Sequence, residues 1–275
     1  MKAEKIKEIV KSRYAKVALH NMPCCGTRKS CCGSSDADDI SKRVGYNDMD
    51  LNSVPEGANL GLGCGNPVAL ALLKEGNVVL DLGSGAGFDA FLAAARVGSS
   101  GKVIGVDMTP EMIEKAKANA VKGGFQNVEF RLGEIENLPV FGSEVDVIIS
   151  NCVINLSPEK GKVFKEAFRV LKPGGRLMVS DLVLLKPLPE IVRQSVEAYV
   201  GCIAGAVMKD EYLSAITAAG FRDLKLVGED LYPVELAVND PAAKAIYSDA
   251  DIIADHAKDI SGSVASIKVS AIKPN

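Results

Sequence analysis

The feature that most constrains the fold is a short apolar run that ends in a glycine-rich turn and opens a helix, beginning at Asn77. The residues read NVVLDLGSGAGFDAFLAAARVG. The run KVIGVDMTPEMIEKAKANA repeats this arrangement, with Thr109 as the expected N-cap and Pro110 at the first helical position. Strands and helices that alternate at these lengths predict a parallel sheet with helices on both faces.

The rest of the chain extends the alternation. We expect strands over 128–133, 145–150 and 175–181, and a helix that opens at Ser157 and Pro158. Next come a mostly apolar helical stretch (EIVRQSVEAYVGCIAGAVM), a helix (DEYLSAITAAG) and two strands (FRDLKLVGED and SIKVSAIK) that close one edge of the sheet. The prediction is therefore a doubly wound, mostly parallel sheet of seven strands.

The residues before Asn77 do not show this alternation of strands and helices. In the first 19 residues, apolar side chains recur at helical spacing among Lys and Glu, which predicts an amphipathic helix packed as a lid or an edge. Residues 21–65 include CCGTRKSCCGSSDADD and show almost no periodicity. Such a segment is longer than a compact domain tolerates as an idle loop, so we expect function or disorder there. Residues 239–261 are expected to be helical.

Composition and charge exclude several classes of function. Hydrophobic residues make up 47% of the 275, which is enough for a packed core. A balance of 32 basic and 35 acidic residues gives a net charge of -3, so no basic field attracts nucleic acid. No apolar run approaches the ~20 residues of a membrane span, and the N-terminus lacks the apolar region of a signal peptide. We expect a cytoplasmic protein with no nucleic-acid or membrane partner.

The glycine-rich turn indicates a nucleotide site. Asp81 ends the preceding strand, and Asp107, 20 residues past Gly87, ends the next one, where a carboxylate can accept both ribose hydroxyls. Glycines in the turn let backbone N–H groups approach a ligand closely. An adenosine-containing cofactor fits these features, and both NAD and S-adenosylmethionine satisfy them. The turn residues expected to contact the cofactor are Gly83, Ser84, Gly85 and Gly87.

Three sequence motifs favour S-adenosylmethionine over NAD. The order VLDLGSGAG resembles motif I of class I methyltransferases, which have a Rossmann-like fold and whose strand-end acid interacts with the amino-acid end of S-adenosylmethionine. GEIENLP (133–139) lies where that superfamily places an acid near adenine N6 and a backbone N–H near the ring. LKPGGRL (171–177) is similar to its turn before the fifth strand. The resemblance implies S-adenosylmethionine as cofactor and adds Met108, Glu134, Ile135 and Asn151 to its expected contacts.

Three cysteines lie far apart in the chain. Cys64 is in LGLGCGNP, Cys152 follows the fourth expected strand in SNCVINLSP, and Cys202 is in AYVGCIAG. Open α/β sheets bind ligands at the carboxyl ends of their strands, so we expect Cys152 near the cofactor's methyl group. Their separations match no local zinc pattern. Taken singly, each is more often an inert buried residue, because a free cysteine behaves as a small hydrophobe.

Seven sequence motifs, in the order in which the family has them, make the resemblance more specific. LGLGCGNP, DLGSGAGFDAFLAA, GVDMTPEMI, GEIENLP, SNCVINLSP, VLKPGGRL and YVGCIAGA together resemble arsenite S-adenosylmethionine methyltransferases over residues 60–220. The resemblance implies that Cys64, Cys152 and Cys202 hold trivalent arsenic as thiolates, with arsenite or thiol-conjugated arsenic as substrate. Thiolates suit this soft acceptor. Three sulfurs leave its lone pair free for the methyl group, so no histidine base is needed.

The resemblance also concerns turnover. Family members have a cysteine pair near the N-terminus that is implied to relay arsenic or to form a disulfide, and thioredoxin or a small thiol is expected to restore oxidised thiols. This chain has two pairs, Cys24-Cys25 and Cys31-Cys32, for which adventitious thiols or a zinc site stay open as alternatives. The family's YYG reads Arg13-Tyr14-Ala15 here. We expect the extra C-terminal region of longer members to be absent or reduced.

The resemblance divides the chain into three expected parts: an N-terminal helix and cysteine-rich substrate loop (1–65), a cofactor-binding core (66–181), and a helical insertion with the final strands (182–275). The expected function is methylation of arsenite to mono- or dimethylated arsenic. A methyltransferase for a small carbon or oxygen substrate such as a quinone precursor stays an alternative, although the chain has no Trp and 5% aromatic residues. A non-catalytic metalloid-binding protein is the other.

Overall fold

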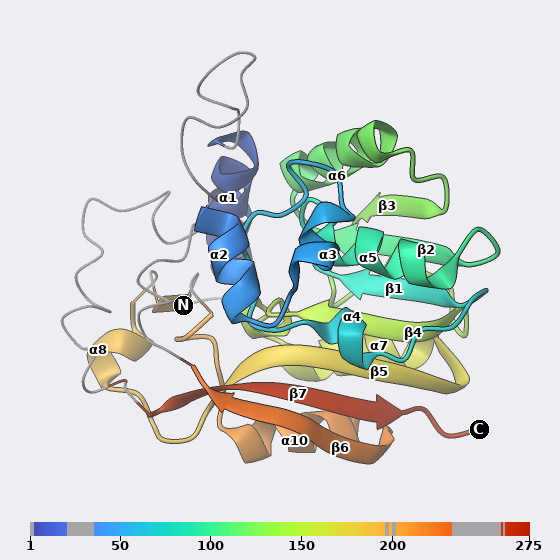
Figure 1. Ribbon diagram of the computed structural model, residues 1–275. Helices are drawn as coiled ribbons and strands as arrows, with labels where there is room; N and C mark the ends of the chain where they lie inside the picture. Colours follow the sequence, from blue (N-terminus) through green and yellow to red (C-terminus); the bar gives the residue numbers. More distant parts are fainter. Residues whose placement is uncertain (1–2, 21–35, 196–197, 200–201, 233–259, 261) are drawn as a thin grey trace.

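The structure is a computed structural model that describes residues 3–20, 36–195, 198–199, 202–232, 260 and 262–275. Seven strands form one sheet in the order β3-β2-β1-β4-β5-β7-β6 (Figure 1). The first five are parallel, and β7 runs antiparallel between β5 and β6. The predicted seven-stranded, mostly parallel sheet is therefore confirmed, including the edge formed by the last two strands.

The strands lie close to the ranges that the apolar runs predict. Their bounds are β1 Val78–Leu82, β2 Lys102–Asp107, β3 Val128–Leu132, β4 Val145–Asn151, β5 Leu171–Leu184, β6 Arg222–Leu231 and β7 Val264–Ile272. The central strands are buried on both faces, as continuous apolar runs in a parallel sheet require. Strand order reverses between β1 and β4, and a crevice at the carboxyl ends of such a pair is the usual ligand site of this architecture.

Helices cover both faces of the sheet. Their bounds are α1 Ala3–His20, α2 Asp36–Arg43, α3 Asp48–Asn52, α4 Pro67–Leu70, α5 Phe88–Val97, α6 Pro110–Gly123, α7 Lys160–Val170, α8 Glu190–Arg193 and α10 Lys209–Ala218, with a 3-10 turn η1 over Ile154–Leu156. Side chains of α4, α5 and α6 pack with Val79 and Val103 on one face. Those of α7 and α10 pack with Leu80 and Ile104 on the other, because neighbouring strand residues point to opposite faces.

The N-terminal helix α1 lies where the parallel strands end (Figure 1). It packs against α6, and Lys115 of α6 donates a hydrogen bond to the Ala18 carbonyl at 3.2 Å. Val10 of α1 is buried in a cluster with Cys64 and Cys202. The predicted amphipathic helix thus forms and covers the ligand-binding end of the sheet. In the described part of the chain, no helix is both long and apolar enough to cross a membrane.

Several expectations about local structure were wrong. The helix expected at Ser157 begins at Lys160, because Ser157 Oγ accepts the Glu159 N–H at 3.0 Å in a turn. The helical stretch expected over 190–208 is not continuous, because α8 ends at Arg193 and the described residues 202–208 form turns and a bridge instead of a helix. Within the segment 21–65, where we expected function or disorder, residues 36–52 include α2 and α3, and Asn47 caps α3. The fifth strand is longer than expected and runs to Leu184. The helix expected over 239–261 lies outside the described residues except for position 260.

Phe164 of α7 tests how the face covered by α7 and α10 is held. It is fully buried, and its ring meets the Tyr212 ring of α10 edge-on, with centroids 5.4 Å apart. We expect Phe164→Ala to lower the free energy of unfolding by about 3–5 kcal/mol, since a large cavity opens between the helices. Phe141→Ala removes a ring that is 81% exposed, and it should change the free energy of unfolding by less than about 0.5 kcal/mol. Urea unfolding of both variants checks this, and equal losses would contradict it.

Candidate functional site

A pocket lies at the carboxyl ends of β1, β2 and β4, and residues of α1 form part of its lining. The turn after β1, the acid that ends β2 and the residues that follow β3 and β4 line it. Helix α1 closes it with Lys7, Val10 and Tyr14. Segments from most of the chain therefore meet here, as expected where the strand order reverses.

The turn between β1 and α5 requires glycine for two different reasons. Gly83 has φ +65°, and a Cβ there would lie 2.3 Å from Cγ2 of Val153. Gly85 has φ +52°, but no described atom lies within 4 Å of the position of a Cβ. The first glycine is thus needed for packing. The second leaves open space beside the backbone, which suits the close approach of a ligand.

Two strand-end acids of the pocket are buried and carry different contacts. No described residue donates a hydrogen bond to Asp81 Oδ2, and burial, followed by the charges of Asp89 and Asp107, raises the pKa of Asp81 well above its ordinary value. Asp107 accepts the N–H groups of Gly85 at 3.0 Å and Thr109 at 2.8 Å, although burial raises its pKa too. A cationic ligand group in the pocket would favour the charged form of these two carboxyl groups and lower their pKa values.

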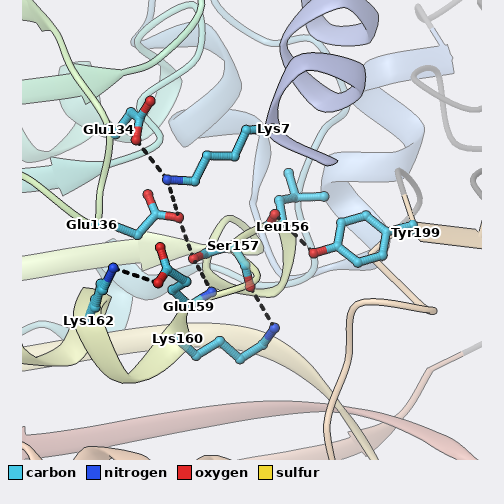
Figure 2. Close-up of polar contacts among 9 residues, drawn as sticks. All are labelled: Lys7, Glu134, Glu136, Leu156, Ser157, Glu159, Lys160, Lys162 and Tyr199. Carbon is cyan, nitrogen blue, oxygen red and sulfur yellow. Dashed lines mark hydrogen bonds and ion pairs between the residues drawn. The ribbon is translucent and has the colours of Figure 1, made fainter. Parts of the chain in front are cut away.

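Ion pairs connect the turn after β3 to helix α1 (Figure 2). Lys7 Nζ lies 2.7 Å from Glu134 Oε2 and 3.1 Å from Glu136 Oε1. Burial lowers the pKa of Lys7, but the two carboxylates outweigh it and raise that pKa overall. Ser157 Oγ donates to Glu136 at 2.6 Å, which ties the same turn to the loop after β4. The Glu134 carboxylate is thus engaged by α1, while Ile135 and Glu136 line the pocket.

A buried polar cluster joins α5 to the end of β4. Tyr46 donates to Asp89 Oδ1 at 2.6 Å, and the Asn151 amide donates to Asp89 Oδ2 at 3.0 Å. Burial raises the pKa of Asp89 to about 6, although the hydrogen bonds from Tyr46 and Asn151 oppose the shift. The expected cofactor contact Asn151 therefore also belongs to a network that the sequence did not indicate. Met108, another expected contact, lines the pocket.

The three distant cysteines come together at the edge of the pocket. The sulfurs of Cys64 and Cys152 and a carboxylate oxygen of Asp181 all lie within 4.8 Å of one another. Cys202 Sγ donates to the Cys152 carbonyl at 3.1 Å. All three are free thiols. Hydrogen bonds with Cys202 and Cys64, followed by burial, raise the pKa of Cys152 well above its ordinary value, and burial raises that of Cys64. At neutral pH these two thiols hold their protons.

Asp181 is a site residue that sequence reasoning missed. It is fully buried, accepts hydrogen bonds from Tyr212 Oη at 2.9 Å and Leu182 N at 2.9 Å, and burial raises its pKa to about 6. Asp181 ends an expected strand, as Asp81 and Asp107 do, so the same sequence pattern could have predicted it as a site residue. Tyr46, Asp89 and Lys7 carried no comparable signal. The pairs Cys24-Cys25 and Cys31-Cys32 lie outside the described residues.

Comparison with known proteins agrees with this geometry. Residues 73–220 match the methyltransferase domain family. A crystal structure of the arsenic(III) S-adenosylmethionine methyltransferase of Chlamydomonas reinhardtii superposes with a TM-score of 0.62 and 32% identity, covering 86% of this chain and 73% of that one. The chain belongs to the arsenite methyltransferase family.

Curated members of the arsenite methyltransferase family are similar over most of this chain. The arsenite methyltransferase of Halobacterium salinarum is 49% identical over 82% of this chain and 60% of its own length. That of Aquipseudomonas alcaligenes is 42% identical over 80% of this chain and 63% of its own length. The chain thus spans about three fifths of the length of these relatives.

Asp89 gives the site a testable pH dependence. Its pKa rises from 3.8 to about 6 on folding, so between these values the folded state keeps a proton that the unfolded state releases. The free energy of unfolding should therefore fall as pH rises from 4 to 6, and level off above. Asp89→Asn should remove up to about 3 kcal/mol of this fall. Urea unfolding from pH 4 to 8 measures it, and parallel curves for the two proteins would show the assignment to be wrong.

Proposed function

We propose that this protein transfers a methyl group from S-adenosylmethionine to trivalent arsenic held by its thiols, which converts arsenite to mono- and dimethylated arsenic in arsenic detoxification. The observation that carries the proposal is the meeting of Cys64 and Cys152, with Cys202 beside them, at the edge of a pocket built like a nucleotide site. Membership of the family supports it, and the curated relatives named above are arsenite methyltransferases.

The pocket suits S-adenosylmethionine, which when bound supplies a methyl group on a positively charged sulfur. Asp81 Oδ2, which no described donor satisfies, would accept the ammonium of the amino-acid end. Asp107 accepts one backbone N–H on each oxygen, so the carboxylate keeps acceptor capacity for ribose hydroxyls. The remaining proposed contacts are Gly83, Ser84, Gly85, Gly87, Met108, Glu134 and Ile135. Of these, Glu134 would contact adenine only by sharing its carboxylate with Lys7. Asn151 also lines the pocket, but its amide already bonds the Cys64 loop, Asp89 and Tyr46, so we do not count it among these contacts.

Protonated thiols suit the capture of arsenite. Each sulfur–arsenic bond replaces one hydroxide of As(OH)3, and the thiol proton leaves with that hydroxide as water. The raised pKa values of Cys64 and Cys152 keep these protons available at neutral pH. With Cys64, Cys152 and Cys202 bound, arsenic is three-coordinate and keeps one lone pair. Because that lone pair needs no deprotonation, the protein supplies no general base for the transfer.

Turnover requires two electrons. Methylation leaves arsenic formally pentavalent, and two nearby thiols that form a disulfide return it to the trivalent state while releasing two protons. Thioredoxin or a small thiol then reduces the disulfide, and Cys24, Cys25, Cys31 and Cys32 would relay arsenic or take part in this exchange. We place the protein in the cytoplasm, where such reductants keep thiols reduced.

Single serine replacements test the arsenic site. We expect Cys64→Ser, Cys152→Ser and Cys202→Ser each to lower the formation of methylated arsenic by at least about 100-fold, since each removes a sulfur ligand. The dissociation constant of S-adenosylmethionine should change little. The measurement is chromatography of arsenic species after incubation of reduced protein with arsenite, cofactor and thioredoxin. Wild-type protein that binds the cofactor but yields no methylated arsenic would refute the proposal, and serine variants that retain methyl transfer would favour a carbon or oxygen acceptor.

Gly85 tests the cofactor site separately. A methyl group at this position enters the open space beside the turn, so Gly85→Ala should weaken S-adenosylmethionine binding by about 10-fold or more. The positive φ should cost only about 1–2 kcal/mol of stability. Gly124→Ala is the matched control, because Gly124 has φ +70° and no described atom within 4 Å of a Cβ, but caps α6 outside the pocket. Calorimetric titration measures the affinity for S-adenosylmethionine, and urea unfolding measures the stability of both variants. Equal affinities for S-adenosylmethionine in the two variants would show that the cofactor binds elsewhere.

A further inference from the structure

The side chain of Asn151 contacts both sides of Cys64. Its Oδ1 accepts the Cys64 N–H at 3.1 Å and lies 3.9 Å from the Cys64 sulfur. Its Nδ2 donates to the carbonyl of Gly65 at 2.8 Å. One amide at the end of β4 therefore binds the backbone of a loop that lies 87 residues earlier in the chain.

Two buried residues fix which way this amide faces. Nδ2 of Asn151 also lies 3.0 Å from Asp89 Oδ2 and 2.9 Å from Tyr46 Oη. Tyr46 in turn donates to Asp89, so its hydroxyl proton is already used and its oxygen is left to accept. A flipped amide would place its oxygen against the Asp89 carboxylate and its NH2 group against the Cys64 N–H. The network thus permits only the orientation that holds the Cys64 loop.

The glycines on either side of Cys64 let the loop lie this close. A Cβ at Gly63 would lie 2.8 Å from Asn151 Nδ2, and a Cβ at Gly65 would lie 1.8 Å from Ser180 Oγ. Ser266 Oγ donates to the Cys64 carbonyl at 2.7 Å from the other side. The loop is therefore packed between β4, β5 and β7, and its cysteine side chain is buried.

We propose that Asn151 is a positioning residue that sets the Cys64 sulfur opposite the Cys152 sulfur. Because Asn151 and Cys152 are consecutive, one strand end carries one sulfur and also holds the loop that carries the other. The sequence resemblance placed Asn151 among the cofactor contacts, whereas the contacts of its amide are with the sulfur-bearing loop. The role in arsenic binding rests on the proposed function, but the spacing of the two sulfurs does not.

Disulfide formation tests the spacing without arsenic or cofactor. Reduced protein is treated with diamide, and the rate at which a Cys64–Cys152 disulfide forms is followed by peptide mass spectrometry. We expect Asn151→Ala to slow this rate by at least 10-fold. It should also weaken arsenite binding, measured by equilibrium dialysis, by about 10–100-fold, the usual cost of removing a residue that orients a ligand. The dissociation constant of S-adenosylmethionine should stay within about 3-fold.

Two further variants separate positioning from general loss of stability. Asn127→Ala removes an amide that donates to Ala94 at 3.1 Å and to Gly98 at 2.9 Å, remote from the pocket, and should leave all three measurements unchanged. Tyr46→Phe removes one hydrogen-bond partner of the Asn151 amide. Like Asn151→Ala, it should slow disulfide formation and weaken arsenite binding, but by a smaller factor. Combined with Asn151→Ala it should add nothing, because both act through one network.

Each outcome decides one claim. An Asn151→Ala protein that forms the disulfide at the wild-type rate would overturn the inference, and a selective loss of S-adenosylmethionine binding would make Asn151 a cofactor residue. If Asn151→Ala does not fold, Tyr46→Phe carries the test, and an unchanged rate in it overturns the inference. If wild-type protein forms the disulfide quickly but yields no methylated arsenic, the proposed function fails while the positioning role stands.

Discussion

The parallel pairing of β4 with β1 on one side and β5 on the other is the constraint on which the site depends. The pairing sets Ser150 beside Leu82, just before the glycine-rich turn, and Asn151 beside Ser180. Because parallel strands end at the same edge of a sheet, the cofactor turn and the buried acid Asp181 flank Cys152 without any long connection. Val153, which follows Cys152 directly, packs into the space that Gly83 leaves. The two halves of the site thus share one strand end.

Burial is the second physical theme of the site, and its effect on charge runs in one direction. It raises the pKa values of Asp81, Asp89, Asp181 and Cys64, because each of these groups is neutral when protonated. Hydrogen bonds with Cys202 and Cys64, followed by burial, raise the pKa of Cys152. Donors such as Tyr46 and Tyr212 only partly offset this cost. A positively charged ligand and an acceptor that removes thiol protons as water would each relieve it. The electrostatics of these buried residues and the proposed chemistry are therefore complementary.

Local patterns in the sequence predicted the sheet well, because apolar runs, helix caps and glycine turns are local signals. Thr109 and Pro110 begin α6 as expected. The short helices α2 and α3 escaped notice because their sequences, DADDISKR and DMDLN, contain only two apolar residues each. The network of Tyr46, Asp89 and Asn151 could not be predicted, since nothing local links residues so far apart. The meeting of the cysteines came from a family resemblance rather than from spacing, and the roles of individual site residues and the three-part division of the chain stay predictions.

The backbone at the sulfurs shows what this arrangement costs. Cys152 and Cys202 have φ of 60° and 63°, a left-handed conformation that costs a non-glycine residue about 1–2 kcal/mol. Glycine would remove the strain but also the sulfur. The surrounding bonds hold the conformation instead: Cys152 N donates to the Ser180 carbonyl at 2.8 Å, and Cys202 N to the Tyr199 carbonyl at 3.0 Å. Strain of this kind persists only where the neighbouring structure fixes it, and it is common at functional sites. Two of the three thiols therefore sit where the fold overrides local preference, which is hard to explain if they only fill the core.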